Sequence, residues 1–134
     1  MKSLIYGYGE TGKSFERYLI KSNLDFEIYD KNISQYNKKY DLESFDQILC
    51  SPGIPINTFN KIKKINQNVI TDIDIFFRED SSIKIGITGT NRKSTTAFHL
   101  HQLFENFDAA NLIGNIGNTC LLYTSDAADE SRGV

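Results

Sequence analysis

The stretch GYGETGKS, at residues 7–14, follows an apolar run and precedes a helical pattern. It fits two fingerprints at once, the dinucleotide-binding G-x-G-x-x-G and the triphosphate-binding G-x-x-x-x-G-K-S. In the first, Gly7 would allow the turn, Gly9 would let a phosphate approach the backbone, and Gly12 would let the helix pack on the strand. In the second, Lys13 would contact phosphates and Ser14 a magnesium ion. These eight residues leave both hypotheses open, together with a purely structural glycine turn.

Along the rest of the chain, segments with the apolar spacing of strands alternate with segments that have the apolar spacing of helices. Strands are predicted at 4–6, 26–30, 47–51 and near 69–70, and helices at 11–22, 57–65 and 72–79. The helix at 57–65 would bring Phe59, Ile62 and Ile65 onto one face. Such alternation predicts an α/β fold, a Rossmann-like parallel sheet with helices on both faces. Ligands of such sheets lie beyond the carboxyl ends of the strands, where the glycine turns fall.

A second unit is predicted to begin after the polar joint at residues 80–82. A strand over 83–88 runs into GTNRKSTT, and a strand is also predicted over 109–114. Between them a helix would bury an apolar stripe, made of Ala97, Leu100, Phe104 and Phe107. We therefore predict one domain over residues 1–82 and the start of another over 83–119.

The last fifteen residues, 120–134, differ in composition from everything before them. They contain no Ile, Asn or Lys, three residue types that are abundant earlier in the chain. The segment CLLYTSDAADE also resembles a translated adapter of the kind used in sequencing libraries. We interpret residues 120–134 as a non-native tail and leave them out of the fold prediction.

The composition excludes several functional classes. With 15 Lys and Arg against 17 Asp and Glu, the net charge is −2, so no basic field is available for a nucleic acid or an anionic membrane. The two cysteines are too few for a disulfide framework or a zinc site. No apolar run approaches the roughly 20 residues of a membrane span. We expect a cytoplasmic monomer that binds neither nucleic acid nor membrane.

Six motifs in order carry a resemblance to a known family: GYGETG, YDKN, SPGI, DIDIFFRE, ITGTN-x-KST and GNIGNT. Over residues 1 to about 119 the chain resembles the N-terminal part of a Mur ligase. The resemblance implies a Rossmann-like domain that docks the UDP end of the substrate. It also implies that residues 83–119 are the truncated start of a P-loop ATPase domain, whose loop has the form G-T-N-G-K-S/T.

The resemblance also assigns roles to individual residues. The UDP-sugar site would be formed by three turns and one later asparagine: Gly9, Glu10 and Thr11 at the diphosphate, Asp30 and Lys31 at the uracil and ribose, Ser51, Pro52 and Gly53 over the pyrophosphate, and Asn115 near the substrate. The ATP site would be formed by Gly89, Thr90, Asn91, Lys93, Ser94 and Thr95. In that loop Lys93 would be the catalytic contact to the phosphates and Ser94 the Mg²⁺ ligand. Lys13 would then be incidental.

The implied reaction is ATP-dependent amide formation with UDP-N-acetylmuramoyl-L-alanine and D-glutamate as substrates, in peptidoglycan synthesis. Two departures bear on it. Arg92 stands where the family has a glycine before the loop lysine, and the family's later metal ligand and C-terminal domain do not occur in the chain. We expect this chain alone to be inactive as a ligase. Gly7, Gly9, Gly12 and Asp30 keep two alternatives open, an NAD-dependent oxidoreductase and a non-catalytic nucleotide-binding module.

Overall fold

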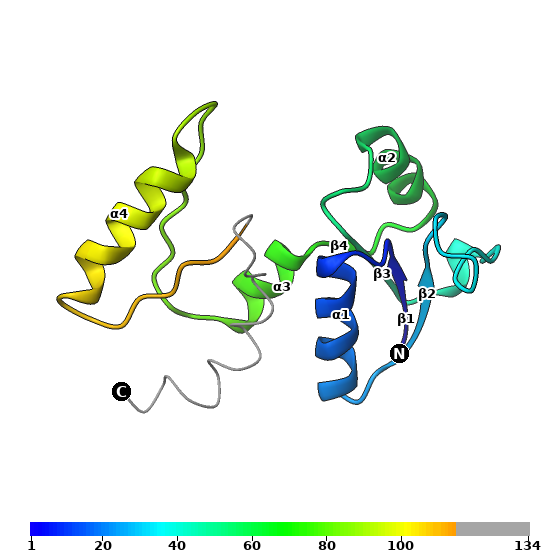
Figure 1. Cartoon of the computed structure of the whole chain (residues 1–134). Coiled ribbons are helices and arrows are strands. Elements are labelled where there is room, and N and C mark those ends of the chain that lie inside the picture. Colours follow the sequence, from blue (N-terminus) through cyan, green and yellow to red (C-terminus); the bar gives the residue numbers. More distant parts are fainter. Residues whose placement is uncertain (115–134) are drawn as a thin grey trace. The chain divides into compact units, whose positions relative to one another are not determined.

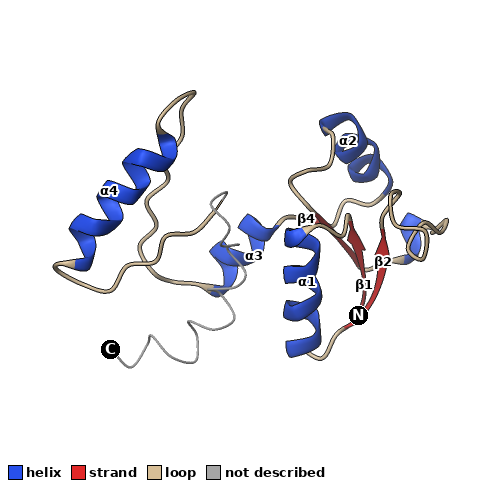
Figure 2. Ribbon diagram, in the orientation of Figure 1, coloured by secondary structure: helices blue, strands red, loops and turns tan. Residues whose placement is uncertain are grey.

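The structure is a computed structural model that describes residues 1–114. The chain divides into two compact units, the first over Met1–Glu79 and the second from Asp80 onward. Figure 1 shows the elements along the chain and Figure 2 their secondary structure. No helix in the described part is long and apolar enough to cross a membrane. Each unit is described below by itself.

The first unit is built on a parallel sheet of four strands. The strands are β1 (Lys2–Tyr6), β2 (Asp25–Tyr29), β3 (Gln47–Cys50) and β4 (Val69–Ile70), in the spatial order β2-β1-β3-β4. All three strand pairs are parallel, with Leu4 opposite Glu27 and Ile48. The helices that connect them are α1 (Glu10–Lys21) and α2 (Ile56–Ile65), with a short 3-10 helix at Leu42–Ser44 before β3. The predicted Rossmann-like α/β fold is confirmed.

Side chains alternate between the two faces of this sheet, and each face has its own cover. On one face Leu4, Ile48 and Cys50 form a buried cluster with Phe45 and with Ile62 of α2. Their neighbours Ile5 and Leu49 point to the opposite face, because successive residues of a strand alternate. There α1, which contacts β1, β2 and β3, buries its apolar residues Phe15 and Leu19 completely. The sheet is therefore covered by helices on both faces, as the sequence predicts.

The helix α2 departs from its predicted face at one residue. Ile62 is 2% exposed and Phe59 is half-buried, but Ile65 is 48% exposed. Ile65 is the last residue of the helix, and the buried position next to it belongs to Asn66. The Asn66 amide donates to the carbonyls of Leu42 and Phe45 at 2.9 and 2.8 Å. Ile65 therefore adds little to the buried side of α2, and the neighbouring buried residue is Asn66, whose amide is satisfied.

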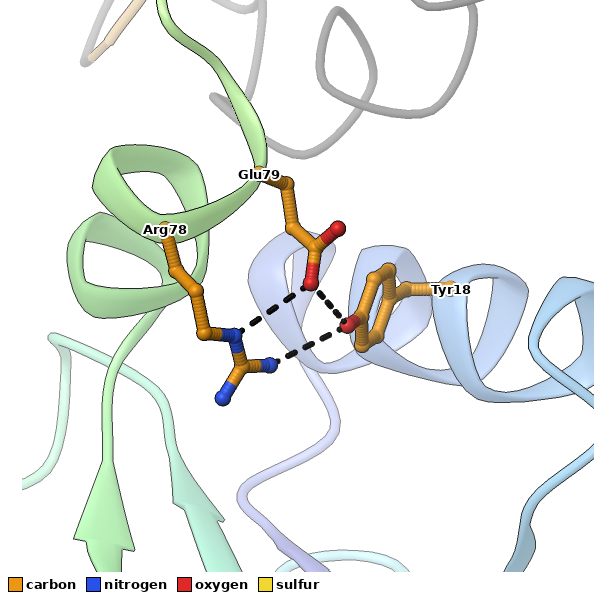
Figure 3. Close-up of polar contacts among 3 residues, drawn as sticks. All are labelled: Tyr18, Arg78 and Glu79. Carbon is orange, nitrogen blue, oxygen red and sulfur yellow. Dashed lines mark hydrogen bonds and ion pairs between the residues drawn. The ribbon is translucent and has the colours of Figure 1, made fainter.

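Helix α3 (Asp72–Glu79) ends the first unit and is tied to α1 by a polar cluster on the surface (Figure 3). The Tyr18 hydroxyl donates to Glu79 Oε1 at 3.1 Å and accepts from Arg78 Nη2 at 3.2 Å. Arg78 Nε lies 3.3 Å from the same Glu79 oxygen. On the same helix, Ile75 and Phe76 are buried. The last turn of α3 is thus fixed to a residue about 60 positions earlier in the chain.

The second unit, as far as residue 114, contains one helix, α4 (Lys93–Glu105), and loops. The strands predicted over 83–88 and 109–114 are not formed, and Ile83 and Ile85 are 95% and 55% exposed. The predicted stripe is not buried either, since Ala97 and Leu100 are half-buried while Phe104 and Phe107 are 42% and 87% exposed. A parallel strand needs a neighbour to satisfy its backbone, and residues 80–114 offer none.

Candidate functional site

Three loops meet at the carboxyl ends of β1, β2 and β3. The backbone N–H of Tyr8, after β1, donates to Oδ2 of Asp30, after β2, at 2.8 Å. The Ser51 hydroxyl, after β3, donates to the carbonyl of Gly7 at 3.0 Å. The Gly7 N–H in turn donates to the Tyr29 carbonyl at 2.8 Å. The predicted turns therefore form one connected surface at one edge of the sheet.

This surface lies where the strand order reverses. From β1 the chain moves to β2 on one side, whereas from β3 it moves to β4 on the other. Loops that diverge in this way leave a crevice between adjacent strands, and open α/β sheets bind their ligands there. In this chain Gly7 and Ser51, which follow β1 and β3, lie at this point of the sheet and are joined by the Ser51–Gly7 hydrogen bond.

The glycines at the edge of the sheet have distinct structural roles. Gly7 has φ +93°, a conformation that L side chains rarely adopt. A Cβ on Gly12 would lie 2.2 Å from the Gly7 carbonyl oxygen, so helix α1 packs directly on the turn. Gly9 caps α1 and has no atom within 4 Å of an added Cβ. The open side of the turn is therefore at Gly9, where free N–H groups of the first helical turn are available.

The triphosphate-loop interpretation of residues 7–14 does not fit this geometry. Ser14 is 2% exposed, and its hydroxyl donates to the Thr11 carbonyl at 2.7 Å instead of facing a metal. Lys13 is exposed and pairs with Glu10 at 3.4 Å. Of the predicted contacts in this turn, Gly9 and Glu10 are exposed and Thr11 is half-buried. The first fingerprint, G-x-G-x-x-G, describes this turn better.

Asp30 uses both carboxylate oxygens to hold the backbone around it. Oδ2 accepts from Tyr8, and Oδ1 accepts from the N–H of Asn32 at 2.8 Å. The Asp30 N–H donates to the Tyr36 carbonyl at 3.3 Å, which closes the loop over residues 30–36. Lys31, on this loop, is exposed. Asp30 lies at the carboxyl end of the sheet, as predicted, and its carboxylate also holds the turns after β1 and β2 together.

Aromatic residues that the sequence analysis did not select surround this edge. The Tyr8 ring meets the Tyr36 ring edge-on at 5.0 Å between centroids, and its hydroxyl donates to Glu16 of α1. That hydrogen bond, with partial burial, raises the pKa of Tyr8 from 10.0 to about 12. Tyr6 and Tyr29 form a second pair at 4.6 Å, where burial raises the pKa of Tyr6 to about 12. Tyr6 and Tyr29 are the last residues of the adjacent strands β1 and β2, a sequence feature that neither glycine fingerprint includes.

The turn after β3 is held from both sides. The Ser51 N–H donates to the Tyr6 carbonyl at 3.3 Å, and its carbonyl accepts from Ile54 at 3.2 Å. Pro52 and Gly53, at the tip, are exposed, and a Cβ on Gly53 would meet nothing within 4 Å. Cys50, which precedes the turn, is buried, and burial raises its pKa to about 12. The thiol is therefore a packing group, whereas the tip of the turn is open to solvent.

The second predicted site is the loop before α4, in the other unit. Gly89 has φ +152°, and Lys93 folds back so that its ammonium donates to the Gly89 carbonyl at 2.5 Å. The predicted ATP contacts Thr90, Asn91, Ser94 and Thr95 are exposed around this loop. Lys93 and Ser94 are the first residues of the helix, whose first N–H groups lack helical partners. A loop of this form places a lysine and backbone donors at one helix start.

Arg92 has φ +60° and ψ 20°, the left-handed conformation, at the N-cap of α4. An L residue there costs roughly 1–2 kcal/mol relative to glycine. The Arg92 side chain makes no capping hydrogen bond, although its carbonyl accepts from Thr96 at 3.0 Å. The position where the family pattern has glycine is thus one where the backbone requires a glycine-like conformation.

The magnesium ion implied by this loop has few ligands among the described residues. No group of three or more His, Cys, Asp or Glu side chains gathers there or elsewhere in residues 1–114. The Ser94 hydroxyl is exposed at the start of α4 and fits a single ligand. Magnesium in nucleotide sites is held largely by phosphates and water, so one hydroxyl is compatible with that chemistry. The predicted substrate contact Asn115 lies outside the described residues.

The chain is also similar in sequence to known proteins. The chain is 36% identical over 129 residues to a UDP-N-acetylmuramoylalanine–D-glutamate ligase of Francisella tularensis subsp. tularensis, which covers 90% of the chain and 30% of the relative. It is likewise 36% identical over 125 residues to the enzyme of that name from Francisella philomiragia, covering 87% and 29%. No protein-family profile matches the chain. The chain spans about 30% of the length of these relatives, and over that span it is similar to these ligases.

Proposed function

We propose that the first unit binds the UDP end of UDP-N-acetylmuramoyl-L-alanine at the carboxyl edge of its sheet. The observation that supports this most directly is the junction of three turns through Tyr8–Asp30 at 2.8 Å and Ser51–Gly7 at 3.0 Å. The free N–H groups at Gly9, Glu10 and Thr11 would face the diphosphate. Asp30 and Lys31 would border the uracil and ribose, and Ser51, Pro52 and Gly53 would cover the pyrophosphate.

In the second unit, the loop at 89–95 would bind ATP. Gly89, Thr90, Asn91 and Thr95 would surround the phosphates, and Lys93 would leave the Gly89 carbonyl to reach them. Ser94 would supply its hydroxyl to Mg²⁺, which neutralises phosphate charge when bound. Asn115 would approach the substrate. We keep the proposed domain limits of 1–82 and 83–119, with 120–134 as a non-native tail.

The complete protein would join D-glutamate to UDP-N-acetylmuramoyl-L-alanine. The γ-phosphate of ATP would pass to the substrate carboxylate and give an acyl phosphate and ADP. The amine of D-glutamate would then attack the acyl carbon, forming the amide and releasing phosphate. Lys93 would stabilise the negative charge of the transferring phosphoryl group. This chain alone, at 30% of the length of its relatives, would bind without ligating.

The cellular role follows from that reaction. The product would be a precursor of peptidoglycan, so the protein would act in cell-wall biogenesis and thereby in cell shape and division. We propose a monomer that works in the cytoplasm. Among the described helices none could span a membrane, and the net charge of −2 gives no basic surface for nucleic acid.

Calorimetric titration of the 134-residue chain tests the proposal. UDP-N-acetylmuramoyl-L-alanine should bind with one site, whereas NAD should not bind measurably. Lys31→Ala should weaken binding of the UDP ligand several-fold because a uracil or ribose contact is lost. Lys38→Ala is the matched control, since it removes another exposed lysine nearby. Binding of NAD in preference to the UDP ligand would contradict the proposal and favour an oxidoreductase.

A further inference from the structure

We infer that Tyr8 and Tyr36 form an aromatic platform for the uracil ring, and so set the preference for a nucleoside diphosphate over a bare diphosphate. This inference rests on the proposed UDP site and extends it to residues outside the three predicted turns. The two rings meet edge-on at 5.0 Å beside Asp30, and both side chains are only half-buried. An aromatic surface open to solvent therefore borders the proposed ribose contact.

Tyr8 is fixed in place by three different groups. Its N–H donates to Asp30, its hydroxyl donates to Glu16 of α1, and its ring contacts Tyr36. One atom of its ring, Cδ2, would lie 3.6 Å from a Cβ on Gly12, so the ring lies across the start of α1. A side chain held at both ends loses little conformational freedom when a ligand packs on it. Tyr8 is thus prepared for stacking.

Tyr36 is brought to the same place by the backbone of its loop. Its carbonyl accepts from Asp30 at 3.3 Å, and its N–H donates to Ile33 at 2.9 Å. The loop therefore returns on itself, so that the residue proposed to bind ribose and the Tyr36 ring lie at its two ends. A ribose at Asp30 would therefore carry its base close to both rings.

Stacking of a base on an aromatic ring contributes roughly 1–3 kcal/mol. That corresponds to an affinity change of about 5- to 150-fold. Pyrophosphate has no ring and would gain nothing from the platform. The ratio of the affinities for UDP and pyrophosphate is therefore the property that depends on the two tyrosines.

The test compares UDP and pyrophosphate binding to the 134-residue chain by calorimetry. Tyr36→Leu, which keeps apolar volume but removes the ring, should weaken UDP by about 5-fold or more and leave pyrophosphate within about 2-fold. Tyr36→Phe, which keeps the ring, should bind UDP within about 2-fold of the parent. Tyr8→Leu and Tyr8→Phe should repeat this difference. Circular dichroism checks that each variant is folded.

Three results would overturn the inference, each for a different reason. If Tyr36→Leu weakens UDP and pyrophosphate equally, the ring only supports the loop. If Tyr36→Leu changes neither ligand, the base lies elsewhere. If the parent binds UDP no more tightly than pyrophosphate, no base platform exists, although a phosphate site does. Failure of the parent to bind either ligand would instead contradict the proposed function itself.

Discussion

The carboxylate of Asp30 accepts a hydrogen bond from the backbone N–H of Tyr8 at 2.8 Å, across 22 residues of sequence. The residue at the end of β2 thereby holds the turn after β1. A substitution at Asp30 therefore changes both a proposed ligand contact and the shape of the turn. Binding experiments at this position need a variant that separates the two effects.

We predict that Asp30→Ala weakens binding of UDP-N-acetylmuramoyl-L-alanine at least 10-fold and lowers stability by about 1–3 kcal/mol, because two backbone donors lose their acceptor. Asp30→Asn retains one carbonyl oxygen and should recover part of the stability. Calorimetry and urea unfolding measure the two quantities. If Asp30→Ala binds as tightly as the parent, the assigned uracil and ribose contact is wrong.

A second prediction concerns the close approach of α1 to the glycine turn. Gly12→Ala should destabilise the first unit by about 3 kcal/mol or more, because its Cβ would lie 2.2 Å from the Gly7 oxygen. Gly9→Ala is the matched control, since nothing lies within 4 Å of that Cβ, and it should cost less than about 1 kcal/mol. Urea unfolding followed by circular dichroism compares them. Equal losses would mean that the turn relaxes to accept the methyl group.

Alkaline pH should destabilise the first unit, in part because its tyrosines lose their hydroxyl protons. The pKa of Tyr8 is about 12 in the folded chain against an ordinary value of 10.0, owing first to its bond with Glu16. The unfolded chain loses that proton first, so the stabilisation is complete below pH 10 and is lost between about pH 10 and 12. Tyr8→Phe should therefore flatten the fall of unfolding free energy over this range. An unchanged slope in urea titrations would contradict the assignment to Tyr8.

The left-handed backbone of Arg92 leads to a prediction for the proposed full-length ligase. Arg92→Gly should relieve roughly 1–2 kcal/mol of strain and raise the rate of phosphate release at saturating ATP. A γ-phosphate displaced by even 1 Å can lower the rate about 100-fold, so catalysis should improve more than ATP binding. Thr88→Gly is the control, since Thr88 is an exposed residue just before this loop that is not among the proposed ATP contacts. Equal rates for parent and Arg92→Gly would show that the loop tolerates arginine.

The two long helices should differ in protection from hydrogen exchange. Helix α1 buries Phe15 and Leu19 completely, whereas α4 has no buried residue and leaves Phe98, Leu103 and Phe104 between 42% and 58% exposed. Amides of α4 should therefore exchange much faster than those of α1, since local packing sets protection. Mass spectrometry of peptic fragments measures both. Similar protection of α1 and α4 would contradict this expectation.

The sequence predicted the first unit well because its signals are local and agree with each other. The run at 4–6, the glycine turn and the apolar residues of α1 each indicate the same βαβ unit, and the parallel sheet follows. The second unit was predicted less well for a different reason. Residues 83–88 have the pattern of a strand, but a pattern does not supply the neighbouring strand that would pair with it.

For the candidate site, the sequence predicted which residue types lie at the sheet edge but not how they are connected. Asp30 was selected for its place after a strand, yet its bonds to Tyr8 and Asn32 depend on the path of two turns. Tyr8 and Tyr36 were missed because their contact joins residues 28 positions apart in no known motif. Contacts of this kind arise from the fold rather than from spacing.

The two outermost strands of the sheet also affect how the chain behaves at high concentration. Of the strands within residues 1–114, β2 and β4 lie at the two edges of the sheet. β4 is only two residues long, and β2 carries Asp25 and Glu27, so neither offers a long apolar template for another chain. The exposed apolar side chains of the second unit have no such protection. Self-association in storage should therefore begin in the second unit, and adding charged residues to α4 should improve solubility more than changing the sheet.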